Sequence, residues 1–231
     1  PLMGTWRNSL RFYGLLGFLM AFIWLLFGRE AQTRIASTKS VSLREAITKL
    51  FKERNVWIIA IIGFSVSFAY YGFGRWLPRT LELNGMSPTE AGFLSSIPGW
   101  CGLIGSLAVP SLAKASLRKS IIFIILLIQG ICVFTIGVSI GLPLVASLIF
   151  YGISASATTP LLIVTVMDMP QVGAKYMGAA SGILFMLAAV GGFTGPLIVG
   201  FLADLTKSII PGLITMAVLV EAMLVFTLLM K

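Results

Sequence analysis

Two stretches of the chain decide its fold: residues 92–113 read GFLSSIPGWCGLIGSLAVPSLA, and residues 182–203 read GILFMLAAVGGFTGPLIVGFLA. Each is free of charged residues and long enough to cross a bilayer, because a transmembrane helix needs about 20 apolar residues. After a shift of 90 positions, eight residues of the two stretches are identical, and three of the eight are glycines. We therefore interpret them as two copies of one helix.

Similar apolar runs fill most of the chain. They lie at 12–27, 56–74, 91–113, 120–167, 176–203 and 208–230, the last interrupted only by Glu221. The run at 120–167 is twice too long for one crossing and carries Gly141, Leu142 and Pro143 at its middle, which favours two helices joined by a tight turn. The sequence thus predicts an all-α membrane protein with seven transmembrane helices.

Composition excludes a water-soluble enzyme. Of the 231 residues 58% are hydrophobic and 11% charged, whereas a soluble domain has about 25% charged residues. There is no His, the commonest general base and metal ligand. Cys101 and Cys132 stand alone in apolar runs, which is typical of core packing. We expect no enzymatic activity, no metal site and no cofactor.

The basic residues indicate how the chain is oriented in the membrane. Seventeen Lys and Arg stand against eight Asp and Glu, an excess that in a soluble chain would suggest a nucleic-acid partner. With alternating crossings, twelve of the seventeen fall on one side of the membrane, seven of them in the loop 29–55. By the positive-inside rule that side is cytoplasmic. We expect a plasma-membrane protein whose long loop and carboxy terminus are cytoplasmic, and no nucleic-acid partner.

Within that loop, Ser42 and Glu45 form a capping box that opens a short helix. The helix has one apolar face, which predicts a position on the membrane surface. The face consists of Leu43, Ala46, Ile47, Leu50 and Phe51.

The two copies found above run in opposite directions, because the third span enters the cytoplasmic side and the sixth leaves it. Spans two to four and five to seven then form two inverted three-helix repeats, which are typical of secondary transporters. Prolines and glycines inside the spans are candidate gating positions, because they bend helices in membranes. They are Pro98, Gly99, Pro160, Gly195 and Pro196.

Several motifs resemble those of the major facilitator superfamily. Residues 70–78 read YYGFGRWLP and 85–94 read GMSPTEAGFL, similar to the passage between that family's seventh and eighth helices. Residues 170–182 and 191–204 resemble its tenth-to-eleventh passage. The Arg-Trp-Leu-Pro sequence at 75–78 further resembles cyanate-permease-like and related anion porters.

The resemblance implies a domain organisation. Residues 1–28 would be the family's sixth helix, 29–55 its cytoplasmic linker, and 56–231 its six-helix carboxy-terminal half. The chain begins with Pro1 and its first span lacks a signal segment, so we expect a piece of a longer protein whose partner is a missing amino-terminal half. One departure concerns residues 110–119, where Lys114 replaces the Asp of the family's loop motif.

The resemblance also places a solute cavity against spans two, three, five and six. By helical spacing, Ser67, Tyr71 and Arg75 share a face of the second span. Residues 151, 154, 158 and 165 share one in the fifth, and Trp100 can add an aromatic wall. The candidate solute contacts are therefore Arg75, Tyr71, Ser67, Trp100, Tyr151, Ser154 and Thr158.

Two charged residues leave alternatives open. Arg75 either contacts an anion or extends to water at the outer interface, since a guanidinium in lipid needs water or a partner. Glu221, the carboxylate well inside a span, is either a proton-coupling residue or a structural partner.

We expect an alternating-access transporter of a small polar solute, which is an anion if Arg75 contacts it, in a protein surrounded by lipid. The alternatives are a transporter for multidrug or amphiphile efflux, and a non-transporting membrane scaffold or receptor-like bundle.

Overall fold

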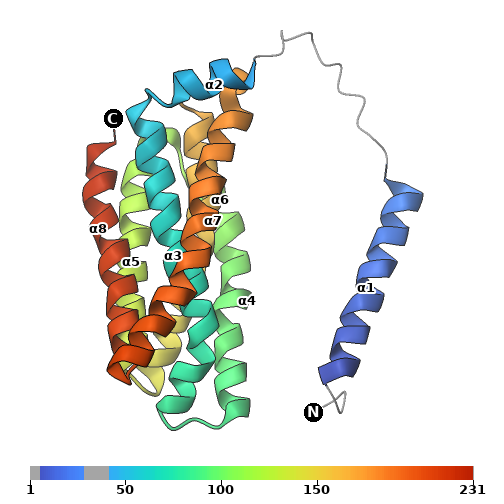
Figure 1. The fold of residues 1–231 in the computed structure, drawn as a ribbon, viewed down its shortest axis with the longest axis vertical. Helices are drawn as coiled ribbons and strands as arrows, with labels where there is room; N and C mark the ends of the chain where they lie inside the picture. Colours follow the sequence, from blue (N-terminus) through green and yellow to red (C-terminus); the bar gives the residue numbers. More distant parts are fainter. Residues whose placement is uncertain (1–5, 29–41, 231) are drawn as a thin grey trace. The chain divides into compact units, whose positions relative to one another are not determined.

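The computed structural model describes residues 6–28 and 42–230, and in these ranges every regular element is a helix (Figure 1). The elements are α1 (Trp6–Phe27), α2 (Leu43–Leu50), α3 (Arg54–Leu83), α4 (Pro88–Leu112), η1 (Ala115–Leu117), α5 (Arg118–Val138), α6 (Leu142–Met167), α7 (Gly173–Thr206) and α8 (Ile210–Leu229). Among them, α1 and α3 to α8 are long and apolar enough to cross a membrane. The prediction of seven spans is confirmed, and the chain is a multi-pass membrane protein.

The expected turn inside the run 120–167 is also confirmed. Helix α5 ends at Val138 and α6 begins at Leu142. Gly141 between them has φ of +67°, a left-handed conformation that glycine adopts without steric cost. Pro143 follows in the first turn of α6, where its missing N–H leaves no helical hydrogen bond unmade.

The chain divides into two compact units, residues 1–40 and 41–231. The first contains α1, and none of the side chains described between Arg7 and Phe27 is buried. The second contains the other helices. Its largest interfaces join α3 with α7 and α4 with α6, followed by α5 with α6, α5 with α8, and α3 with α8.

These interfaces follow the inverted repeat. In the repeat, α3 corresponds to α6, α4 to α7 and α5 to α8. The α3–α7 interface therefore corresponds to the α4–α6 interface, and the α5–α6 interface corresponds to the α3–α8 interface. Figure 1 shows that consecutive helices alternate in direction along the bundle, so α4 and α7 are antiparallel. Helices α3 to α8 therefore form a bundle of two inverted three-helix repeats, as the glycine pattern predicts.

Matched glycines make matched contacts. A methyl group added to Gly105 of α4 would overlap the carbonyl oxygen of Ile153 on α6, and one added to Gly195 of α7 would overlap the carbonyl oxygen of Phe68 on α3. Phe68 and Ile153 are 85 positions apart. Both helix pairs therefore approach backbone to backbone at equivalent points, as small residues permit in membranes.

A second pair repeats the relation. The space beside Gly102 is occupied by Ser156, and the space beside Gly192 by the ring of Tyr71. Tyr71 and Ser156 are again 85 positions apart. Tyr71 on α3 and Ser156 on α6 are thus equivalent positions of the two repeats.

Helix α2 packs on the start of α7. Ala46 and Leu50 are buried there. The hydroxyl of Tyr176 donates to Glu45 Oε1 at 3.3 Å, and the Lys49 ammonium lies 4.4 Å from the centre of the Tyr176 ring. Part of the predicted apolar face is therefore used against α7.

The rest of the apolar face of α2 is largely uncovered by other helices of the described part of the chain. Ile47 and Phe51 are exposed, and the ring of Phe51 packs edge-on against Trp57 at 4.7 Å. Ser42 caps α2 as predicted, because its Oγ accepts a hydrogen bond from the amide of Glu45 at 3.2 Å. The Leu43 side chain and residues 29–41, the remainder of the predicted linker, lie outside the description.

Candidate functional site: two connected cavities in the bundle

A central cavity of about 660 Å³ lies among α3, α4, α6 and α7. Its polar lining is made of hydroxyl groups, from Ser67, Tyr70, Tyr71, Ser106, Ser156 and Thr159. The space persists because other lining positions are small, namely Gly99 on α4 and Ala188 and Ala189 on α7. Such a cavity can hold a small hydroxylated solute through hydrogen bonds.

A second, outer cavity of about 370 Å³ adjoins the first. Both are lined by Tyr70, Tyr71 and Gly99, so these residues stand at the junction. The two tyrosine rings meet edge to face, with centres 5.4 Å apart. Beyond them, the outer cavity is lined by Phe73, Gly74, Arg75, Leu77, Ser95, Pro98 and Tyr151.

The structure brings together only some of the residues expected from sequence. Ser67 and Tyr71 line the central cavity, Arg75 and Tyr151 the outer one. Trp100 lines neither, and its side chain is 72% exposed.

Ser154 and Thr158 are packed between helices. Both are buried and neither lines the cavities. Thr158 Oγ1 donates to the Ser154 carbonyl at 2.9 Å and accepts from Gln129 Nε2 of α5 at 2.7 Å. The Thr158 hydroxyl thus joins α5 to α6, whereas the Ser154 hydroxyl donates to the carbonyl of Phe150 in its own helix at 2.8 Å.

The α6 residues that do line the central cavity, Ser156 and Thr159, were missed from sequence. The sequence repeat gave no signal for them: at its shift of 90 positions Tyr71 aligns with Leu161, and the pairing of Tyr71 with Ser156 comes from the structure. Helical spacing by itself could not choose, because α6 carries hydroxyls on both faces.

The candidate gating positions lie at different places in the bundle, and some of them line the cavities. Pro98 lines the outer cavity and Gly99 both cavities. Pro160 lies within α6 and Pro196 within α7, and the indole of Trp76 donates to the Pro196 carbonyl at 3.2 Å. A gating role for these residues, and for Gly195, stays a prediction.

Glu221 lies on α8 against Gly130 of α5, away from both cavities. It lines a separate apolar pocket of about 530 Å³. Its Oε1 atom is buried without a hydrogen-bond partner among the residues described. Its coupling role also stays a prediction.

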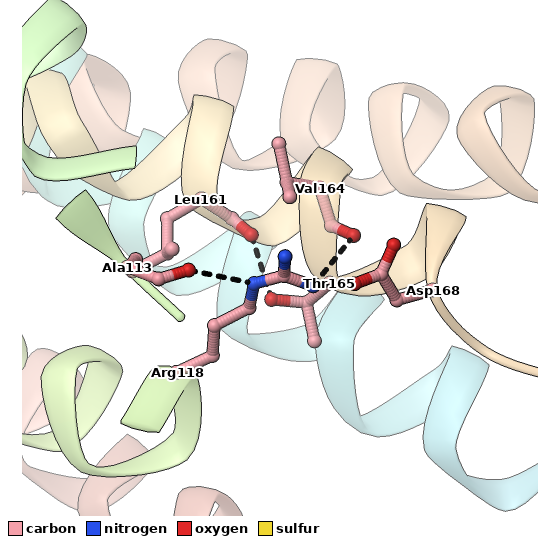
Figure 2. A network of polar contacts seen from close by, with 6 residues as sticks. All are labelled: Ala113, Arg118, Leu161, Val164, Thr165 and Asp168. Carbon is pink, nitrogen blue, oxygen red and sulfur yellow. Dashed lines mark hydrogen bonds and ion pairs between the residues drawn. The ribbon is translucent and has the colours of Figure 1, made fainter. Parts of the chain in front are cut away.

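A polar network joins α5 and α6 where α6 ends (Figure 2). The Arg118 guanidinium donates to the carbonyls of Ala113 at 3.2 Å and Val164 at 3.3 Å, and forms an ion pair with Asp168. Asp168 lies at the end of α6, and its side chain stays half exposed while it pairs with Arg118. Lys114 in the same loop is exposed.

The amino ends of α3 and α5 hold the end of α8. Lys119 Nζ donates to the carbonyls of Leu228 at 2.9 Å and Met230 at 2.7 Å. Arg54 donates to the carbonyl of Leu229. Cations at this position satisfy the free carbonyls of a helix carboxy terminus.

In 6–28 and 42–230, no three metal-ligating side chains come together. The arrangement is one of cavities and hydroxyls, which suits noncovalent binding of a solute.

Comparisons with known proteins agree on one family. The family model described as Major Facilitator Superfamily matches residues 2–196 and 80–230. An uncharacterized protein of Archaeoglobus fulgidus is 25% identical over 78% of this chain and 81% of its own length. A putative tartrate transporter of Agrobacterium vitis is 25% identical over 90% of this chain and 45% of its own.

A hexuronate transporter of Bacillus subtilis is 24% identical over 87% of this chain and 52% of its own length. The chain thus spans about half the length of these two transporters.

Proposed function

Because the chain belongs to the Major Facilitator Superfamily, a family of transporters and not of enzymes, we propose that it forms half of a secondary transporter that moves a small, hydroxylated anionic solute by alternating access. The observation that carries the proposal is the hydroxyl-lined central cavity at the junction of the two inverted repeats. Transporters of this architecture bind solute near the middle of the membrane at the repeat interface.

The solute class is supported by chemistry and by relatives. Six hydroxyl-bearing residues line the cavity, and hydroxyls donate and accept hydrogen bonds to polyhydroxylated molecules. Two relatives are named for tartrate and hexuronate, which are hydroxylated acids. Arg75 supplies positive charge beside the cavity.

A second six-helix unit is part of the proposal. The two named transporters are about twice as long as the matched region. Helices α4 and α7, which border the central cavity, expose large apolar side chains that suit such a partner. These include Phe93, Leu107, Phe193 and Phe201.

The proposal also includes orientation. The unit lies in the plasma membrane with α2, the α5–α6 network and the end of α8 on the cytoplasmic side, because basic residues gather there. They include Arg44, Lys49, Lys52, Arg54, Lys114, Arg118, Lys119 and Lys175.

The experiment is uptake of labelled tartrate and glucuronate by proteoliposomes that contain the full-length protein. Ser67→Leu and Ser156→Leu fill the central cavity and are expected to stop uptake. Ser96→Leu is the matched control, because Ser96 is exposed on α4 and lines neither cavity.

Uptake that survives both cavity substitutions would contradict a solute pathway through the central cavity. No uptake of any solute by the unmodified protein would favour a scaffold. Transport of lipophilic cations in place of acids would favour the efflux alternative.

A further inference from the structure

The outer cavity has a chemistry of its own. The central cavity has no charged lining residue, whereas the outer one has the guanidinium of Arg75. Arg75 lies 21 residues after the start of α3, which at 1.5 Å per residue is about 32 Å along the helix. Since the hydrocarbon core is about 30 Å thick, the outer cavity lies near one membrane boundary.

The guanidinium of Arg75 is unpaired within the described part of the chain. The next two carboxylates along the sequence are engaged elsewhere: Glu82 pairs with Arg79 at 3.2 Å, and Glu90 accepts hydrogen bonds from the amide and hydroxyl of Ser87 at 2.9 and 2.7 Å. A guanidinium with five donors and no carboxylate partner can bind an external anion.

The hydroxyl of Tyr151 is a second group without a partner in the outer cavity. Its side chain lines the outer cavity, is only 2% exposed, and packs on the ring of Phe73 with centres 4.5 Å apart. Its hydroxyl has no hydrogen-bond partner among the described residues. A buried hydroxyl without a partner is unfavourable, so a small side-chain movement that opens it to the cavity would let it donate to an acceptor atom there.

From this juxtaposition we propose that Arg75 and Tyr151 form an outer subsite that binds the carboxylate of the solute before its body enters the central cavity. The inference rests on the proposed function and assigns a separate role to each cavity: the outer cavity binds the carboxylate, and the central cavity binds the hydroxyl groups. Arg75 matches a carboxylate because its planar fork donates two parallel hydrogen bonds.

Tyr70, Tyr71 and Gly99 separate the two spaces and line both. A solute that leaves Arg75 therefore passes these tyrosines to reach Ser67, Ser156 and Thr159. The substrate class is a small organic acid with several hydroxyls next to its carboxylate.

The test compares an acid with its neutral ester. Uptake of glucuronate and tartrate, and its inhibition by their methyl esters, is measured in proteoliposomes with the full-length protein and its variants. In the unmodified protein the acids should bind better than the esters. Arg75→Gln should raise KM for the acids about tenfold or more, as expected for hydrogen bonds to a charged group, and leave ester inhibition unchanged.

Two further variants separate binding from folding. Arg75→Lys keeps the charge without the fork and should give an intermediate KM, which an unfolded protein would not. Tyr151→Phe should raise KM severalfold. Arg79→Gln is the matched control, because Arg79 lies one helical turn away, pairs with Glu82 and lines neither cavity.

The outcomes are distinct. If acids are transported and Arg75→Gln alters acid and ester equally, or alters neither, the outer subsite is wrong while the proposed function stands. If no acid is transported by the unmodified protein, both are wrong.

Discussion

Thr158 and Thr159 are consecutive residues of α6 with opposite surroundings. Thr158 is buried and accepts a hydrogen bond from Gln129 of the neighbouring α5, whereas Thr159 lines the central cavity. Thr158→Val leaves the Gln129 amide without its partner, which costs about 1 kcal/mol in membrane proteins. We expect a lower melting temperature in detergent with KM for the solute unchanged.

Thr159→Val is the matched comparison, since it removes the same hydroxyl from the cavity instead of the interface. It should preserve the melting temperature and raise KM. A reversed pattern, in which Thr158→Val raises KM without loss of stability, would show that the two residues have been assigned to the wrong faces.

At the level of elements, helix contacts depend on glycines. Gly→Ala at 105 or 195 places a methyl group on a backbone carbonyl of the neighbouring helix. The helices must separate, and overpacking of this kind costs about 1–3 kcal/mol. Thermal unfolding in detergent should show destabilisation for both variants to a similar extent, because the two contacts are equivalent in the repeat.

Gly92→Ala and Gly182→Ala serve as controls, because a methyl group there meets no atom within 4 Å. They are expected not to lower the melting temperature, because alanine favours a helix more than glycine does. Equal losses at all four glycines would contradict the account, because the loss would then not depend on a close contact with the neighbouring helix.

The network around Arg118 links α5 with α6, and its interactions contribute unequally to stability (Figure 2). The Arg118 side chain is 14% exposed and that of Asp168 50%, so the ion pair is partly in water and contributes at most about 1 kcal/mol. The two carbonyl bonds from the guanidinium are worth more. Arg118→Gln should therefore lower the melting temperature more than Asp168→Asn does.

The measurement is thermal unfolding of the two single variants and the double variant at low and high salt. Only the Asp168 contribution should diminish with salt, and the double variant should resemble Arg118→Gln. A larger loss from Asp168→Asn would contradict this ranking.

Much of the helical arrangement could be predicted from sequence. Uncharged runs gave the seven spans, Gly141 and Pro143 gave the α5–α6 turn, and matched glycines gave the inverted repeat that the helix interfaces follow. These features depend on hydropathy and steric size, which are local properties of the chain.

The face of α6 could not be predicted in this way. In a membrane, hydroxyls are used both to line a cavity and to bond helices together. Ser154 and Thr158 have the spacing of a cavity face, yet they lie in an interface, and Ser156 and Thr159 line the cavity. The rotation of α6 is set by the close contacts of Gly105 and its neighbours, which involve residues distant in sequence.

For the whole molecule, the central claim is that the cavity among α3, α4, α6 and α7 is a solute path open to each side of the membrane in turn. The direct test uses the full-length protein with Cys101 and Cys132 replaced and one cysteine introduced at Thr159. A membrane-impermeant thiol reagent is applied from each side, with and without the transported acid. A cysteine at Thr158 is the control.

The expected result is that the cysteine at 159 reacts from either side, that the acid slows both reactions, and that the cysteine at 158 stays unreactive. Reaction from one side only, at a rate that the acid does not change, would contradict alternating access through this cavity.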